Sequence, residues 1–236
     1  MGKIRTFVKT AQNAAFDFWE GLQTTFSGIK TSIWIPKTTD TNANAAIKPK
    51  GNGANVAQDP DGTATGGNAR GQYATDWQKS RSSNTEVASG DYSTIGGGQN
   101  NLSSGLQSTV GGGIANDATG VRSFIGGGIN NRATGSRATV SGGDGNAATG
   151  SHATVGGGQS NTASTGTHAT VSGGLTNTAS GGASTVGGGD ANAASGGRST
   201  VGGGEGNTAS GNRATIGGGK DNTSSGTRAT VSGGDN

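Results

Sequence analysis

Isolated aliphatic residues recur at an almost constant spacing along the C-terminal two-thirds of the chain, each surrounded by small or polar residues. The steps between them are 15, 15, 15, 15, 16, 15, 15, 15 and 15 residues. A fixed period of this kind is typical of a repeat architecture, in which each unit packs against the next. The ten aliphatic positions are Ile95, Val110, Ile125, Val140, Val155, Val171, Val186, Val201, Ile216 and Val231.

Glycine divides every unit into two short arms. A Gly-Gly pair soon follows each aliphatic residue, as at Gly97-Gly98, and another Gly stands five positions before it, as at Gly90. Glycine at two corners suits turns with positive φ or close backbone approach, and the arms are too short for helices. We predict a mainly β fold, a parallel β-roll or β-solenoid of ten coils of about 15 residues over residues 87–236, with about 4.8 Å between coils. The one extra residue falls within Thr162–Thr165, so we expect it at a corner, where the stack keeps its register.

Stacking such coils would place identical side chains above one another. Asn recurs once per unit, and we expect the side-chain amides of this column to hydrogen-bond up and down the stack. Thr precedes the aliphatic residue in every unit except one, where Phe124 replaces it, and a column of Ala or Ser lies beside the Thr column. The Asn column comprises Asn101, Asn116, Asn131, Asn146, Asn161, Asn177, Asn192, Asn207 and Asn222.

The predicted core is thin. One Val or Ile and a few small residues per coil bury little apolar surface compared with the entropy of ordering a whole coil. Several chains that pack their aliphatic columns around a shared axis would remedy this deficit. We therefore expect an obligate oligomer.

The N-terminal segment follows a different pattern, because apolar residues recur at steps of three and four between residues 3 and 27. This spacing predicts a short amphipathic α-helix, which covers its own domain, starts a coiled coil, or docks on a partner, since buried aromatic residues dominate interface energies. Residues 1–35 are then an attachment segment and residues 36–86 a connector with fixed turns such as Pro60-Asp61-Gly62. The candidate docking residues are Phe7, Phe16, Phe18, Trp19, Leu22, Phe26 and Trp34.

Composition argues against a single compact core. Only 28% of the residues are hydrophobic, and 50 of the 236 are Gly, far from the balance of a globular domain. Such a composition favours disorder, but a disordered tract has no reason to keep a strict period. The net charge of +3 gives no basis for a nucleic-acid partner. The chain has no Cys for a disulfide or a thiolate metal site, and it lacks the long apolar run of an inserted membrane segment.

One column of the repeat is basic, and it is the candidate for surface binding. As a stripe it could bind anionic glycans or lipopolysaccharide phosphates. The simpler explanation is that an acidic column at Asp144, Asp190, Glu205 and Asp235 balances it and that both discourage sideways aggregation. The members of the candidate anion-binding stripe are Arg122, Arg137, His152, His168, Arg198, Arg213 and Arg228.

The sequence offers no convincing metal or catalytic site. His152 and His168 occupy neighbouring units and could share a metal, but no third ligand is evident in their column. Calcium is not expected, because the position of Asp144 is held by Ile114 and Leu175 in other units, so carboxylate ligands do not recur. No nucleophile and base stand out from the repetitive background. We expect no enzymatic activity, no catalytic residue and no cofactor.

The repeat units resemble the head repeats of trimeric autotransporter adhesins, which also occur in bacteriophage tail fibres. The resemblance covers about residues 87–236 and rests on units such as Ala118-Thr119-Gly120 and Asn207-Thr208-Ala209-Ser210-Gly211. It implies a left-handed parallel β-roll with three chains around one axis, and therefore a homotrimer. The stretches Lys48–Gly53 and Pro60–Gly71 also resemble the segment before such repeats in phage fibres.

The resemblance to phage fibres implies a structural tail-fibre protein. Its N-terminus would dock on the virion tail, baseplate or an adaptor protein, and its repeat shaft would project towards the host surface and its glycans for adsorption. Such fibres assemble in the bacterial cytoplasm, which agrees with the polar residues that interrupt any secretory signal at Lys9 and Asp17. A bacterial trimeric adhesin head is the first alternative. An ice-binding solenoid is the second, although Phe124 interrupts its Thr column and the neighbouring column mixes Ala and Ser.

Overall fold

The computed structural model describes residues 31–34, 46–49, 55–56, 60–63, 67–78 and 80–235. Within these residues the chain forms 23 strands and no helix. The chain divides into two units, Met1–Asn52 and Gly53–Asn236, which are considered one at a time.

The first unit contains one described element, an antiparallel pair of strands. β1 (Thr31–Trp34) pairs with β2 (Ala46–Pro49), so that Thr31 lies opposite Pro49 and Trp34 lies opposite Ala46. The helix predicted for residues 3–27 lies outside the described residues.

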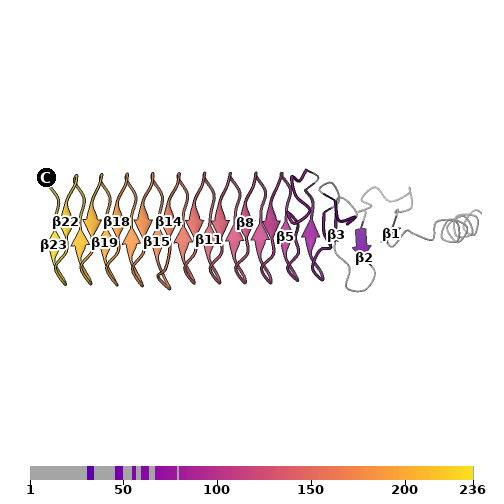
Figure 1. Ribbon diagram of the computed structural model, residues 1–236, viewed down its shortest axis with the longest axis horizontal. Coiled ribbons are helices and arrows are strands. Elements are labelled where there is room, and N and C mark those ends of the chain that lie inside the picture. The colour runs from indigo at the N-terminus through magenta and orange to yellow at the C-terminus, as the bar shows by residue number, and fades with distance from the viewer. Residues whose placement is uncertain are drawn as a thin grey trace, which may run out of the picture. The chain divides into compact units, whose positions relative to one another are not determined.

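The second unit is a parallel β-solenoid, as the repeat predicts (Figure 1). From β5 to β22 each coil contributes one two-residue strand to each of two parallel sheets, whereas β3, β4 and β23 belong to coils that contribute to one sheet alone. We call the twelve-stranded sheet the Thr sheet; its strands are β3 (Asn55–Val56), β4 (Thr75–Asp76), β5 (Thr94–Ile95), β7 (Thr109–Val110), β9 (Phe124–Ile125), β11 (Thr139–Val140), β13 (Thr154–Val155), β15 (Thr170–Val171), β17 (Thr185–Val186), β19 (Thr200–Val201), β21 (Thr215–Ile216) and β23 (Thr230–Val231). We call the nine-stranded sheet the Ala sheet; its strands are β6 (Leu102–Ser103), β8 (Asp117–Ala118), β10 (Arg132–Ala133), β12 (Ala147–Ala148), β14 (Thr162–Ala163), β16 (Thr178–Ala179), β18 (Ala193–Ala194), β20 (Thr208–Ala209) and β22 (Thr223–Ser224).

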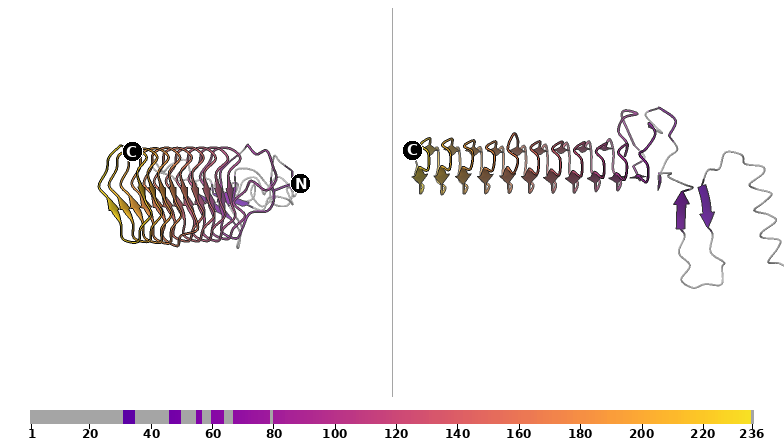
Figure 2. Two further views of the ribbon diagram at one scale, coloured as in Figure 1. Left: turned by 60° about the vertical axis from the view of Figure 1, so that its left-hand side comes forward. Right: turned by 90° about the horizontal axis from the view of Figure 1, so that it is seen from below.

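The 15-residue spacing of the sequence sets the register between successive coils. Val140 pairs with Val155 one coil on, and Ala133 pairs with Ala148 in the same way on the other sheet. Backbone N–H groups reach the carbonyls of the next coil at 2.8–3.1 Å along both arms, as from Thr139 to Ala153 and from Ala147 to Asn161. Figure 2 shows from two further sides how closely successive coils superimpose. The sheets begin before residue 87, because β4 and β3 extend the Thr sheet towards the N-terminus.

The core is a single file of side chains enclosed between the two sheets. Each coil buries one Val or Ile from the Thr sheet, one Ala or Ser from the Ala sheet, and a further Ala or Ser and an Asn near the corners. In one coil these are Val140, Ala148, Ala138 and Asn146, all at most 1% exposed. The predicted column of Ala or Ser beside the Thr column therefore points inward.

The expectation that several chains pack their aliphatic columns around a shared axis is wrong. Each of the nine members of the aliphatic column from Ile95 to Ile216 is completely buried by its own chain. The reason is geometric: Thr and the aliphatic residue alternate along a strand, so Thr faces outward and the aliphatic side chain faces the opposing sheet. Any contact between chains must therefore use the outer surface of the coils.

The Asn column forms the predicted ladder, mainly through backbone partners. The side-chain oxygen of Asn146 accepts the backbone N–H of Asn161 at 2.9 Å, and its amide nitrogen donates to the carbonyls of Gly142 and Gly158 at 2.9 Å each. The Asn residues from Asn101 to Asn207 repeat this arrangement, and some also bond to the neighbouring Asn side chain, as Asn116 does to Asn101 at 3.2 Å. Asn222, in the last coil, keeps the two bonds to carbonyls. Because every polar atom of the amide has a partner from Asn101 to Asn207, a polar residue can occupy the core without penalty.

Glycine serves different purposes at the two corners. After the aliphatic residue, Gly98 has φ +84°, and its equivalents are also left-handed, as predicted. At the other corner, Gly120 does not have positive φ; a Cβ there would overlap the carbonyl oxygen of Gly135 in the next coil. The left-handed residue of this corner comes two positions later, at Arg122 with φ +58°. Gly120 and its equivalents are therefore required because successive coils approach each other closely at this corner.

The extra residue of the longer unit lies at a corner, as predicted. Thr165 has φ +33°, and its hydroxyl donates to the carbonyl of Ser180 at 2.7 Å. The strands on both sides remain paired in register, because Thr162 lies opposite Thr178 and Thr154 lies opposite Thr170.

A polar cluster covers the N-terminal end of the core. Asp76 takes the place of the aliphatic residue and is held by Arg70 at 2.9 Å and Arg81 at 3.1 Å, all three side chains being buried. Gln78 bonds to the backbone N–H and carbonyl of Asn101 at 2.9 and 2.7 Å. Terminal units of solenoids typically carry such polar caps, so this part of the predicted connector ends the stack. The predicted turn at Pro60-Asp61-Gly62 also forms, with Gly62 at φ +76°.

Replacing Asn161 with Ala should lower the free energy of unfolding by about 2–4 kcal/mol, because it leaves the buried N–H of Asn177 and the carbonyl of Gly157 without partners and removes one of two bonds to the Gly174 carbonyl. Urea denaturation followed by circular dichroism measures the change. Asn212→Ala, the same substitution at an exposed corner, should change stability by at most about 0.5 kcal/mol. Equal midpoints for the two variants would contradict the proposed role of the Asn ladder.

Gly120→Ala should destabilise the roll by about 1–3 kcal/mol, because the added methyl group overlaps the backbone of the next coil. Gly218→Ala is the matched control, since a Cβ at this position meets no atom within 4 Å. It should be neutral or slightly stabilising, because Ala restricts the unfolded chain. Thermal denaturation of both variants tests the distinction between corner positions.

Candidate functional site

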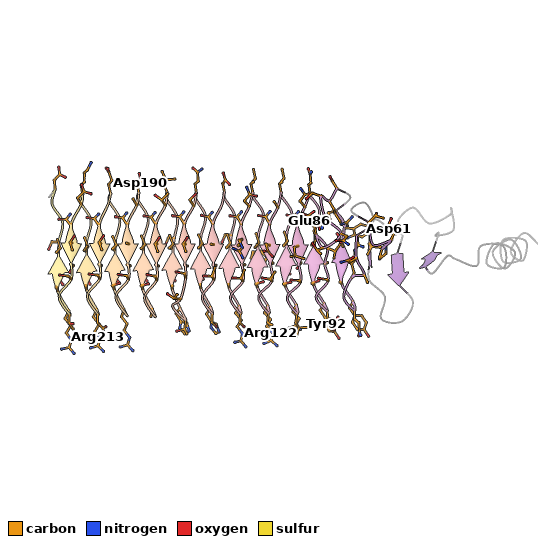
Figure 3. The ribbon with its side chains drawn as sticks, viewed as in Figure 1. Asp61, Glu86, Tyr92, Arg122, Asp190 and Arg213 are labelled. Carbon is orange, nitrogen blue, oxygen red and sulfur yellow. The ribbon has the colours of Figure 1, made fainter. Side chains whose placement is uncertain are left out.

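The predicted basic stripe is a continuous column along one edge of the solenoid (Figure 3). We call this edge, formed by the corners that follow the Ala sheet, the basic edge. All seven candidate residues from Arg122 to Arg228 are exposed there, one per coil, with Ala183 interrupting them. Tyr73, Tyr92 and Gln107 continue the column towards the N-terminus. The stack thus brings together residues that lie up to 106 positions apart in the sequence, from 122 to 228.

Neighbouring members of the basic edge contact one another. Arg122 donates from Nε to Oε1 of Gln107 at 2.9 Å, and the guanidinium of Arg137 lies 3.2 Å from Nε2 of His152. The rings of His152 and His168 stack with centroids 5.1 Å apart, and Tyr73 stacks on Tyr92 at 5.0 Å. Arg198, Arg213 and Arg228 lie in successive coils, so three like charges are stacked, which is unfavourable unless an anion lies nearby.

Several of these side chains occupy backbone positions that would suit Gly better. Arg122, Arg137, His152, Arg213 and Arg228 have φ between +58° and +60°. The left-handed region costs a residue with a Cβ about 1 kcal/mol or more, whereas it costs Gly almost nothing. The backbone of the corner therefore does not require arginine or histidine at these positions.

The two histidines do not form a metal site with other described residues. No group of three His, Asp or Glu side chains within the described part of the chain could hold an ion. Nε2 of His152 faces the Arg137 cation at 3.2 Å, and Nδ1 lies 3.0 Å from the hydroxyl of Ser151. A metal at Nε2 would have to displace that cation, so the geometry disfavours metal binding.

The acidic column lies on the opposite edge from the basic column. The second set of corners, which follows the Thr sheet, forms what we call the acidic edge, and Figure 3 shows Asp190 there, across the coil from Arg122 and Arg213. This column is continuous through bridges from Gln99 to Asp235. Within one chain the two columns are thus too far apart to pair. The explanation that the acids balance the basic stripe therefore fails for a single chain.

The acidic edge consists of Gln99, Ile114, Ile129, Asp144, Gln159, Leu175, Asp190, Glu205, Lys220 and Asp235. The charges on it that pair within the chain do so locally: Lys220 bonds Glu205 at 3.0 Å, which raises the pKa of the lysine. Another pair lies on the outer face of the Ala sheet, where Arg132 lies 3.8 Å from Asp117. Burial raises the pKa of Asp117, and Arg132 opposes that rise. No described ion pair includes a member of the basic edge.

The sequence analysis overlooked a set of exposed apolar side chains. They are concentrated near the N-terminal end of the stack, and the only one far from it is Leu175. The signal was present, because each replaces a small or polar residue in its column, as Phe124 replaces Thr. The exposed large hydrophobic residues of the described chain are Tyr73, Trp77, Tyr92, Leu106, Ile114, Val121, Phe124, Ile129 and Leu175.

The predicted docking residues are outside the described part of the chain, except one. Trp34 ends β1, and its backbone lies opposite Ala46. Among the described residues no helix could cross a bilayer. The docking role of the N-terminal segment stays a prediction.

No family model matches the chain, and a comparison with curated proteins finds no match.

Replacing Arg213 with Gly should change stability by less than about 0.5 kcal/mol, because relief of the left-handed backbone offsets the greater entropy of the unfolded chain. Arg198 belongs to the same column but does not have positive φ. Arg198→Gly should therefore cost about 0.5–1 kcal/mol. Thermal denaturation at high salt, where surface charges are screened, measures both, and a larger loss for Arg213→Gly would refute the interpretation.

Proposed function

We propose that this chain is the structural subunit of a homotrimeric bacteriophage tail fibre. The N-terminal segment, residues 1–35, attaches it to the virion tail, and the solenoid projects towards the host surface for adsorption. The single observation that carries the proposal is the unbroken parallel stack from β3 to β23, in which every coil bonds to the next.

The stack has the mechanical character of a shaft. Its coils are joined by backbone hydrogen bonds and the Asn ladder, and from β5 to β23 consecutive strands are separated by only five or six residues, too few for a loop that could close over a ligand. The resemblance of its units to phage-fibre repeats supports the same conclusion. The thin core and the exposed apolar residues support assembly of several chains, because each chain alone buries one branched aliphatic side chain per coil.

The Thr ladder favours a second candidate function, ice binding. From Thr139 to Thr215 the outer face of the Thr sheet carries one partly exposed Thr per coil at a regular spacing. The neighbouring outward column consists of Gly and Ser, as at Gly156 and Ser172, and Phe124 interrupts the ladder. A thermal-hysteresis assay on the purified chain distinguishes this function, which needs the Thr face to be open to solvent.

Light scattering of the purified chain at low concentration should give about three times the chain mass of 22.7 kDa.

In a phage background, deletion of residues 2–35 should yield particles that lack the protein, while the truncated chain still gives the β-rich circular dichroism spectrum of the solenoid. Immunogold electron microscopy with an antibody to the solenoid detects the protein on particles. Particles that still carry the truncated chain, or a folded monomer in solution, would overturn the proposal.

A further inference from the structure

We infer that each chain meets its neighbours through the outer face of the Thr sheet and both edges, so that the basic edge of one copy contacts the acidic edge of the next. This inference rests on the homotrimer proposed above and adds the surfaces, their order and the polarity of the chains. The observations that carry it are the distribution of apolar residues and charges over those three surfaces.

Exposed apolar residues on the two edges lie at the same level of the stack. In the two coils that include β7 and β9, the basic edge carries Leu106 and Val121, and the acidic edge carries Ile114 and Ile129. Each is 44–45% exposed, and the other large aliphatic residue of these columns is Leu175 on the acidic edge. If neighbouring copies lie parallel and in register, the aliphatic part of one edge meets the aliphatic part of the other.

Charges on the two edges also match along the stack. Three cations of the basic edge lie in the same coil as a carboxylate of the acidic edge, namely Arg137 with Asp144, Arg198 with Glu205 and Arg228 with Asp235. Arg213 is level with Lys220, which already pairs with Glu205. The carboxylates of a neighbour would relieve the repulsion of three stacked arginines, which no described carboxylate of the same chain does.

The outer face of the Thr sheet is suited to face the axis of the assembly. From β5 to β23 its two outward columns, Thr and the Gly or Ser two residues later, contain no charged residue. The large side chains on this face are Trp77 and Phe124, both 43% exposed. Small residues allow close approach of neighbouring chains, and rings from three copies would meet near the axis. The Ala sheet carries Asp117 and Arg132 on its outer face and would remain in solvent.

These features select parallel chains and a closed ring. An antiparallel neighbour would place the aliphatic part of one edge against the arginines of the other. A two-fold contact between identical edges would place arginine against arginine. Contacts between different edges are heterologous, and they form a ring when the rotation closes. A linear polyanion lying along the arginines is the competing occupant, but it leaves Leu106, Ile114, Trp77 and Phe124 unexplained.

Cysteine crosslinking tests the contact, because the chain has no Cys. Arg198→Cys and Glu205→Cys are made singly and together and treated with a short bis-maleimide. We expect the double variant to run as a covalent trimer on a denaturing gel and each single variant to run as a monomer. The control pair Arg132→Cys and Thr208→Cys, on the outer face of the Ala sheet, should give monomer only.

Light scattering on the same samples separates this inference from the proposed function. Trimers that do not crosslink through the double variant would overturn the edge contact and leave the homotrimer standing. Covalent dimers from either single variant would show contact between identical edges, which also overturns it. Monomers would overturn both this inference and the proposed homotrimer. In that case we would test binding of dextran sulfate. Loss of this binding on replacing Arg198, Arg213 and Arg228 with Ser would favour a polyanion as the ligand of the basic edge.

Charge reversal provides a second measurement. Changing Arg137, Arg198 and Arg228 to Glu should raise the concentration at which the trimer dissociates at least tenfold, because carboxylates then face each other in three coils. Adding Asp144→Arg, Glu205→Arg and Asp235→Arg in the same chain should restore assembly. Failure of this rescue, with folding intact by circular dichroism, would contradict the pairing of edges.

Discussion

The structure depends on hydrogen bonding between each coil and the next. The backbone ladders of two sheets and the Asn side chains join successive coils every 15 or 16 residues. This bonding requires near-identical coils, since a Cβ at Gly120 or its equivalents would separate them. Regularity of the sequence is therefore a condition of the fold, and the narrow core follows from it, because two arms of two residues leave room for one branched side chain.

A fold held together in this way suits a structural role. The aliphatic residues of its interior are enclosed and the Asn amides have partners. From β5 onwards, changes of charge from coil to coil are found at outward positions, which therefore carry whatever the molecule recognises. Basic residues at left-handed corners, acids on the opposite edge and apolar residues near the N-terminal end are departures from the repeat that the fold itself does not need.

The polar cluster around Asp76 covers the N-terminal end of the apolar core. Asp76 occupies a core position that holds Ile or Val elsewhere, the side-chain oxygen of Gln78 accepts a backbone N–H as the Asn oxygens do in later coils, and two arginines neutralise the buried carboxylate. Burial lowers the pKa of Arg70, and the contact with Asp76 opposes this change. A buried charge is tolerated only when it is paired and hydrogen-bonded. This cluster takes the place of an aliphatic layer in the coil of β4 and covers the layer of Ile95.

The sequence by itself determined the period, the two corners, the parallel stacking, the Asn ladder and the position of the extra residue at Thr165. These features are local or repeat identically, so that one unit predicts all the others. The tertiary structure alone decided that Val140 and its equivalents are enclosed by their own chain, that Asp76 and Gln78 cap the core, and that arginines and acids lie on opposite edges. Those facts depend on how the two arms face each other and on which residues the stack brings to one edge. A repeat pattern specifies the neighbours along the stack, whereas the direction in which each column points is decided only when the coil closes.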